Sequence, residues 1–168
     1  MSNSPDQRLS HIDESGDSRM VDVSQKAVTA RRARASGQVR MRKKTREAIA
    51  ADSGPKGSVL GTARIAGVQA AKRTGFLIPL CHPLGLDLVQ IDFRWEDDVG
   101  AEALLTVEAE AVATARTGVE MEALTAVSVA ALTVYDMTKA IDRSIVLENI
   151  RLEEKLGGKS GHWQRKDS

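Results

Sequence analysis

The longest hydrophobic segment of the chain runs over Val119–Ile141, and its charged residues stand only near its two ends. Glu120 and Glu122 lie at the start, Asp136 and Lys139 lie near the finish, and the residues between carry no charge. A surface helix would repeat a polar face every three to four residues. The pattern therefore predicts a buried helix. At about 1.5 Å of rise per residue, Glu122 and Asp136 are roughly 21 Å apart along the axis.

This separation constrains what the charged ends of the helix can do. No small-molecule pocket within one chain easily spans it, so either the ends serve different purposes or different subunits bring opposite ends together. A second helix is predicted over Gly57–Thr74, where apolar residues recur near the helical period. Gly61 and Gly67 cost this helix conformational entropy, and we expect them to permit close approach to a neighbouring backbone. Both helices favour an oligomer.

Alternating apolar and polar residues predict the strands. The expected strands are Met20–Ser24, Gly37–Met41, Leu86–Trp95, Ala101–Val112 and Ile145–Leu152, with a short helix over Thr45–Ala51. The turn Asp97–Gly100 makes a hairpin of the third and fourth strands. Without the first segment the order is strand, helix, strand, strand, helix, strand, which is the ferredoxin-like split βαβ arrangement. The predicted fold class is α+β, an antiparallel sheet with helices on one face.

The length of 168 residues suits one domain with a core of its own. Residues 1–19, rich in Ser, Asp and Gly, are predicted to form a mobile N-terminal tail. Residues 20–156 form a single catalytic domain, and residues 157–168 a glycine- and lysine-rich tail that begins too glycine-rich for regular structure. Lys155 and Lys159, at this end of the chain, either fold over an anionic ligand or are solvated.

Composition excludes several classes of protein. Lys and Arg number 24 against 23 Asp and Glu, and aromatic residues are 3%, which argues against nucleic-acid binding. A single cysteine excludes a disulfide framework and favours a reducing compartment. The polar N-terminus lacks the apolar region of a signal peptide, and no run of 18 apolar residues predicts a membrane span. We expect a soluble cytoplasmic protein.

Lys56 stands where the second predicted helix begins, directly after Gly54-Pro55. A cation at a helix N-terminus opposes the helix dipole, whereas free amides at that position bind anions. Lys56 with the amides of Gly57 and Ser58 could hold a phosphate, or the lysine is merely solvated. The segment is not a P-loop, because the required glycine and lysine spacing is absent.

His82 lies in the proline-flanked loop Ile78–Leu84. Such a loop can aim an imidazole into a pocket, for proton transfer or for a phosphate, although a lone loop histidine is also commonly structural or exposed. Zinc is disfavoured because too few ligands cluster nearby. On its own, Cys81 is interpreted as a small buried apolar residue.

The charged residues of the long helix form two pairs. Asp136 and Lys139 are three residues apart and share one helix face, so they form either an acid–base couple or an ordinary surface ion pair. Glu120 and Glu122 are two residues apart and cannot face the same way. Either one of them contributes to a site, or both only favour the helix N-terminus.

Five long segments together resemble one known family. They are residues 20–27, 56–74, 77–84, 117–137 and 157–161. These segments are similar to the cyclic pyranopterin monophosphate synthases, the C protein of molybdenum-cofactor biosynthesis, and the resemblance extends from about Leu9 to Gly161. It implies a ferredoxin-like α+β subunit in a homohexamer built as a trimer of dimers, with active sites at subunit interfaces.

The resemblance also implies a reaction, that of a phosphorus–oxygen lyase. A cyclised GTP derivative, 3′,8-cyclo-7,8-dihydro-GTP, is rearranged to cyclic pyranopterin monophosphate with release of pyrophosphate, and no metal or redox cofactor is required. The implied catalytic residues are Lys56, Asp136 and Lys139. The implied substrate-binding residues are His82, Glu120, Met121, Glu122, Leu80, Cys81, Lys26, Arg31, Lys155 and Lys159. Arg116 stands where many members have lysine.

One alternative belongs to another class of protein. A non-catalytic nucleotide-binding or scaffold protein of the same fold would bind the triphosphate with its lysines, and its carboxylates would only pair with them. The intact pair of Asp136 and Lys139 beside Lys56 favours the enzyme.

Overall fold

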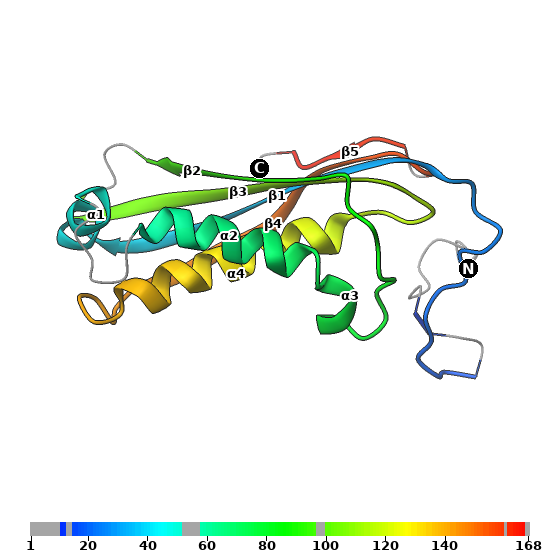
Figure 1. The fold of residues 1–168 in the computed structure, drawn as a ribbon, viewed down its shortest axis with the longest axis horizontal. Coiled ribbons are helices and arrows are strands. Elements are labelled where there is room, and N and C mark those ends of the chain that lie inside the picture. Colours follow the sequence, from blue (N-terminus) through cyan, green and yellow to red (C-terminus); the bar gives the residue numbers. More distant parts are fainter. Residues whose placement is uncertain (1–10, 13–14, 52–57, 97–99, 160, 167–168) are drawn as a thin grey trace, which may run out of the picture.

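The computed structural model of the chain describes residues 11–12, 15–51, 58–96, 100–159 and 161–166. Figure 1 shows an elongated molecule in which long strands run parallel to two long helices. In chain order the elements are β1 (Thr29–Arg42), α1 (Lys43–Ala50), α2 (Val59–Ala71), α3 (Thr74–Leu77), β2 (Leu88–Trp95), β3 (Glu102–Ala115), α4 (Glu120–Thr138), β4 (Val146–Leu156) and β5 (Trp163–Gln164).

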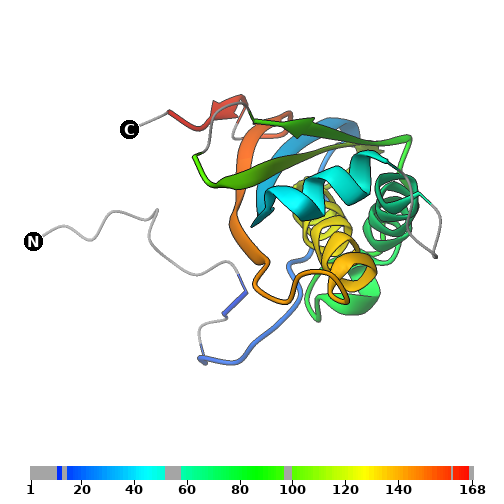
Figure 2. The same ribbon diagram turned by 90° about the vertical axis from the view of Figure 1, so that its left-hand side faces the viewer.

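The strands form one antiparallel sheet in the order β2-β3-β1-β4-β5. Its first four strands have the order of the ferredoxin-like arrangement, and α2 and α4 lie side by side on one face (Figures 1 and 2). The predicted α+β fold is therefore confirmed, as is the hairpin of β2 and β3. The turn of that hairpin, at residues 97–99, lies outside the described residues.

The core lies between the sheet and the helix pair. In α4, the buried positions are Glu122, Ala123, Thr125, Ala126, Val127, Ala130, Ala131, Val134 and Thr138. The small side chains let α4 approach both the sheet and α2, which confirms the expectation of a buried helix. Its observed ends, Glu120 and Thr138, lie slightly inside the predicted ones.

The two helical glycines turn out to have different roles. A Cβ at Gly67 would lie 2.3 Å from Cδ1 of Ile91 and 2.8 Å from the carbonyl oxygen of Ala126, so Gly67 permits close packing of α2 on α4. This contact is within one chain. A Cβ at Gly61 would meet only the side chain of Ser58, which caps the helix N-terminus. The prediction of close backbone approach is therefore confirmed for Gly67, whereas for Gly61, which meets only Ser58 within this chain, it stays a prediction.

The predicted strand at Met20–Ser24 is absent from the structure. Asp22 accepts a hydrogen bond from the amide of Ser24 at 2.8 Å, and the amide of Lys26 donates to the carbonyl of Val23 at 3.0 Å. This Asp-centred turn replaces the strand because aspartate bonds its own local backbone readily. Of the predicted N-terminal tail, the described residues contain a single bridge, Ile12 to Ser18, and no helix or strand.

Two further differences concern element boundaries. β1 begins at Thr29, well before the predicted start at Gly37, because arginines alternate with buried alanines along its first half. β5 lies within the predicted C-terminal tail and pairs with Glu154 and Lys155 of β4. The tail and domain limits stay predictions. Among the described residues, no helix is long and apolar enough to cross a membrane.

Candidate active site

A cavity of about 860 Å³ lies at one end of the sheet. Four segments line it: the turn before β1, the first residues of β1, the connection from β3 to α4, and the end of β4 with the residues that follow. The antiparallel register brings them together, since Thr29 pairs with Ala115 and Arg32 pairs with Leu156. Five of the predicted substrate-binding residues line this cavity: Lys26, Arg31, Glu120, Lys155 and Lys159.

The lining of this cavity, hereafter the basic cavity, is dominated by positive charge. It contains six lysine and arginine side chains and only two carboxylates, Asp22 and Glu120. Lys155 lies 3.3 Å from a carboxylate oxygen of Glu120. A hollow with excess cationic side chains attracts anions and suits phosphate groups.

Arg31 is held in place by the backbone around it. Its Nε donates to the carbonyl of Ala115 and its Nη2 to the carbonyl of Arg116, both at 3.3 Å. Gly157 and Gly158 have φ values of +97° and +75°, and a Cβ at Gly158 would lie 1.8 Å from Nη1 of Arg31. The two glycines thus allow the chain to cross directly over the guanidinium, which explains the glycine-rich motif at this position.

The start of α4 adds a buried carboxylate. Glu122 is only 4% exposed, and Glu120, as expected, points elsewhere, toward the basic cavity. Burial raises the pKa of Glu122 to about 6, with a smaller contribution from the negative charge of Glu120. Burial also raises the pKa of Cys81, and the charge of Glu122 adds to this, which places Cys81 near Glu122. Cys81 is half-buried, as are Leu80 and Met121.

The loop of His82 reaches the same end of the molecule. The hydrogen bonds from Ser24 lower the pKa of Asp22, and the nearby charges of His82 and Lys26 lower it further. A Cβ at Gly75 would lie 2.9 Å from Cα of Pro83, so Gly75 lets α3 pack closely on this loop. The structure therefore gathers His82, Cys81 and both glutamates around the start of α4.

Asp136 and Lys139 lie at the opposite end of α4. Their side chains are 58% and 52% exposed, and Nζ of Lys139 is 2.6 Å from Oδ1 of Asp136. The hydrogen bond that Lys139 donates to Asp136, together with the negative charge of Asp136, raises the pKa of Lys139. Neither residue lines the basic cavity. The third predicted catalytic residue, Lys56, lies outside the described residues.

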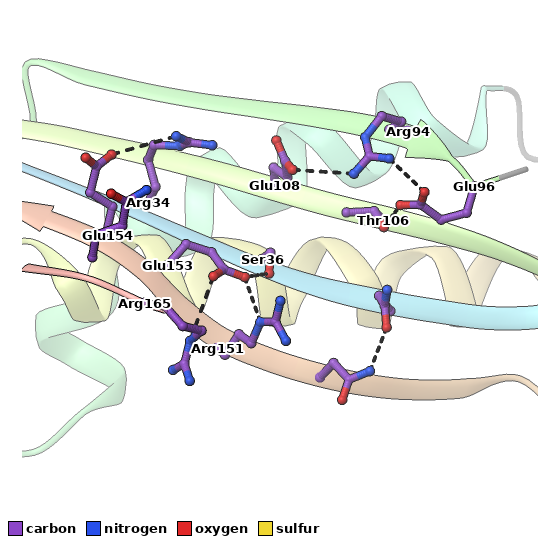
Figure 3. Close-up of a pocket in the computed structure, with 13 residues that line it drawn as sticks. Arg34, Ser36, Arg94, Glu96, Thr106, Glu108, Arg151, Glu153, Glu154 and Arg165 are labelled. Carbon is purple, nitrogen blue, oxygen red and sulfur yellow. Dashed lines mark hydrogen bonds and ion pairs between the residues drawn. The ribbon is translucent and has the colours of Figure 1, made fainter. Parts of the chain in front are cut away.

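A second hollow, of about 310 Å³, lies on the face of the sheet away from the helices (Figure 3). Its lining holds equal numbers of arginines and glutamates, which pair with one another or with hydroxyl groups. Glu153 accepts from Ser36 and Arg151, and Glu96 accepts from Thr106 at 2.6 Å. Because its charges are balanced internally, this hollow attracts anions less than the basic cavity does.

Within the described ranges, no three His, Cys, Asp or Glu side chains are grouped so that they could hold a metal ion.

The sequence of the chain is similar to a known protein family and to several named proteins. The model of the MoaC family matches residues 20–158. The chain belongs to the MoaC family. A Mycobacterium tuberculosis protein named cyclic pyranopterin monophosphate synthase 3 is 57% identical over 99% of this chain and 92% of its own length. A protein named cyclic pyranopterin monophosphate synthase from Novosphingobium aromaticivorans is 60% identical over 93% of this chain and 96% of its own length. A protein of the same name from Streptomyces avermitilis is 58% identical over 94% of this chain and 90% of its own length.

Several cavity residues of this MoaC family chain were not among the predicted site residues. Asp22, Gln25, Arg32, Arg116 and Thr117 also line the basic cavity. Arg32 directly follows the predicted residue Arg31, and Arg116 directly precedes the resembling segment 117–137. Their positions beside predicted residues are the signal that could have found them. Asp22 and Gln25 lie in the resembling segment 20–27, which is the signal for them, although a strand rather than a turn was predicted there.

Proposed function

We propose that the chain is a cyclic pyranopterin monophosphate synthase. In this reaction a lyase rearranges 3′,8-cyclo-7,8-dihydro-GTP to cyclic pyranopterin monophosphate and releases pyrophosphate. The names of relatives at 55–60% identity over nearly the full chain support this function. The structural observation that carries it is the basic cavity, whose volume of about 860 Å³ suits a nucleotide-sized ligand and whose charge suits a triphosphate.

The residues of the basic cavity have the chemistry that pyrophosphate release needs. To form a cyclic phosphate, a hydroxyl oxygen of the substrate attacks the α-phosphorus, and the bond from that phosphorus to pyrophosphate breaks. The hydroxyl proton passes to a base, and the leaving pyrophosphate keeps the bonding electrons. Lys26, Arg31, Lys155 and Lys159 would bind the phosphates and stabilise this charge, because fixed cations stabilise charge that develops in the transition state.

The proton transfers fall to the predicted catalytic residues. The ammonium of Lys139 carries a proton that it could donate, and its hydrogen bond to Asp136 would hold the ammonium in position. Lys56 is assigned to the same chemistry on its motif alone. His82, Glu120 and Glu122, with the half-buried Leu80, Cys81 and Met121, would surround the rest of the substrate.

The position of Asp136 and Lys139 supports a site that includes a second subunit. They are separated from Glu122 by most of α4, roughly 21 Å along its axis, and the basic cavity does not include them. We therefore infer that a neighbouring chain brings its Asp136 and Lys139 to the cavity of the first, in a homohexamer built as a trimer of dimers.

Exposed apolar side chains on α2, α3 and α4 support such an assembly. Ile65 of α2 is 62% exposed, Leu132 of α4 is 54% exposed, and Phe76 of α3 is 83% exposed. Large apolar surfaces that remain exposed commonly mark protein interfaces. A cytoplasmic location stays a prediction, for which the single cysteine is the support.

The function is tested by incubating the pure protein with 3′,8-cyclo-7,8-dihydro-GTP and measuring pyrophosphate and the pterin product. The proposal expects both products in equal amounts from the wild-type protein and neither from Asp136→Ala. The alternative, a nucleotide-binding or scaffold protein, expects retention of the ligand without pyrophosphate. Binding of the ligand by calorimetry, measured alongside, separates a protein that does not turn over from one that does not bind.

A further inference from the structure

A fully buried carboxylate lies in the turn that follows α4. Asp142 is 0% exposed, three residues beyond Lys139. Its Oδ2 accepts hydrogen bonds from the amide of Arg42 at 3.0 Å and the hydroxyl of Thr45 at 3.1 Å. Its Oδ1 accepts from the amide and hydroxyl of Ser144 at 3.0 and 2.6 Å, and Nε of Arg42 lies 3.0 Å away. Both oxygens are thus fully engaged.

The hydrogen bonds decide the ionisation of Asp142. Burial alone would raise its pKa, but the donors from Ser144 and Arg42 outweigh burial and hold the pKa of Asp142 well below its usual range. The side chain is therefore a carboxylate at neutral pH. A buried charge whose hydrogen bonds are all satisfied fixes the elements that supply its donors.

Two of the donor residues, Arg42 and Thr45, come from a distant part of the sequence. Arg42 ends β1 and Thr45 lies in the first turn of α1, about 100 residues before Asp142 in the chain. The guanidinium of Arg42 also donates to the carbonyl of Ile141. The turn after α4 is thereby bound to the junction of β1 and α1 through both backbone and side chain.

The same turn is tied to the last residues of α4. The amides of Ile141 and Asp142 donate to the carbonyl of Thr138 at 2.8 and 3.0 Å, and Thr138 itself is 2% exposed. Helix ends otherwise fray, because their last carbonyls lack partners within the helix. Asp136 and Lys139 project from this final turn and are more than half exposed, so the position of the turn's backbone sets where both side chains start.

We propose that Asp142 is a positioning residue for the pair of Asp136 and Lys139, because it anchors the helix end that carries both side chains. The effect on the geometry of Lys139 is independent of any activity. The effect on turnover rests on the proposed function, in which this pair transfers protons.

The test is Asp142→Asn in the full chain, with two readouts. The substitution keeps the shape but turns one acceptor into a donor that faces other donors. Modification of Lys139 by an amine-reactive reagent, followed by peptide mass spectrometry, should be several-fold faster, since a looser contact with Asp136 frees the amine. The kcat should fall by about 10- to 10²-fold, the scale of a misplaced reactive group, while KM stays within about 3-fold because the basic cavity is unchanged.

Two threonine variants provide a matched comparison. Thr45→Val removes a buried hydroxyl that donates to Asp142, and Thr106→Val removes a buried hydroxyl that donates to Glu96 on the far face of the sheet. Thr45→Val should change Lys139 labelling and kcat in the same direction as Asp142→Asn, but less. Thr106→Val should change neither. If Asp142→Asn does not fold, as judged by circular dichroism, Thr45→Val carries the test.

The outcomes separate this proposal from the function on which it rests. Unchanged Lys139 labelling in folded Asp142→Asn and Thr45→Val would overturn the positioning role. Equal effects in Thr106→Val would overturn it too, because they would reveal a general loss of stability. Faster labelling with normal kcat would uphold the positioning of Lys139 and instead remove the pair from the proposed reaction.

Discussion

The two ends of α4 are built in opposite ways. At its start, Glu122 is buried and the basic cavity is formed from four segments of the same chain. At its finish, Asp136 and Lys139 stand more than half exposed above a buried anchor, Asp142. The first end carries a hollow lined mainly by cationic side chains, whereas the second presents an exposed ion pair. This division is what the proposed site shared between subunits would require.

The largest expected effect concerns the exposed end. Lys139→Ala should lower kcat by about 10²-fold or more, the usual contribution of an acid–base group, with the fold intact because the side chain is exposed. Lys56→Ala should do the same. Steady-state kinetics with circular dichroism measure both effects, and Lys44→Ala, an exposed lysine on α1, is the control. Near-normal turnover of a folded Lys139→Ala would leave the exposed end without a catalytic role.

The next prediction tests whether opposite ends meet between chains. Asp136→Ala and Lys155→Ala are each expected to be inactive. After subunit exchange, an equal mixture should regain activity at about a quarter of the sites if chains mix at random in a closed oligomer. Pyrophosphate release before and after exchange measures this recovery. No recovery despite exchange demonstrated by native mass spectrometry would mean that each site lies within one chain, and full activity of a monomer would dismiss the shared site.

A smaller effect is expected from the buried end, and it concerns stability. Folding raises the pKa of Glu122 from 4.5 to about 6, so the folded state binds its proton more tightly than the unfolded state does. Stability from this group is present below pH 4.5 and is lost as the pH rises through about 6. The full cost above that pH is about 2 kcal/mol.

Glu122→Gln should therefore stabilise the fold at pH 7 and flatten the decline in stability between pH 4.5 and 6.5. Urea unfolding of both proteins across this range measures the difference. Glu120→Gln is the matched control, since Glu120 lies in the same helical turn but is only half-buried. Parallel curves for wild type and Glu122→Gln would mean that Glu122 is not desolvated in the assembled protein.

Much of this fold follows from patterns along the chain. The charge-free centre of α4 and the alternation in β2, β3 and β4 predicted those elements, because burial on one face imposes the corresponding period. β1 was predicted too short because the charged arginines in its first half do not suggest a strand. The neighbouring Ala33 and Ala35 are nevertheless buried. β5 depends on pairing with β4, which no local pattern encodes.

The site was predictable only in part, for a related reason. The resemblance supplied Lys26, Arg31, Lys155 and Lys159, and the sheet register brings all four to one cavity. Asp142 was missed because its donors at Arg42 and Thr45 are distant in sequence, and its surroundings read as an ordinary charged turn. Buried polar contacts of this kind become visible only once the chain is folded.

The smallest expected effect is the change in thermal midpoint on substitution at the exposed end of α4. The side chains of Asp136 and Lys139 are more than half exposed in the single chain, where an ion pair of this kind adds little to stability. Asp136→Asn should leave the thermal midpoint unchanged within the precision of calorimetry, at low and high salt alike, while abolishing most turnover. Asp142→Asn, six residues away, should lower the midpoint clearly because it disturbs a buried carboxylate. A clear drop for Asp136→Asn that depends on protein concentration would show that this end is buried against a neighbouring subunit. A drop independent of protein concentration would mean that the ion pair stabilises its own chain. The exposed end of α4 would then contribute to folding stability, as the buried start of the helix does.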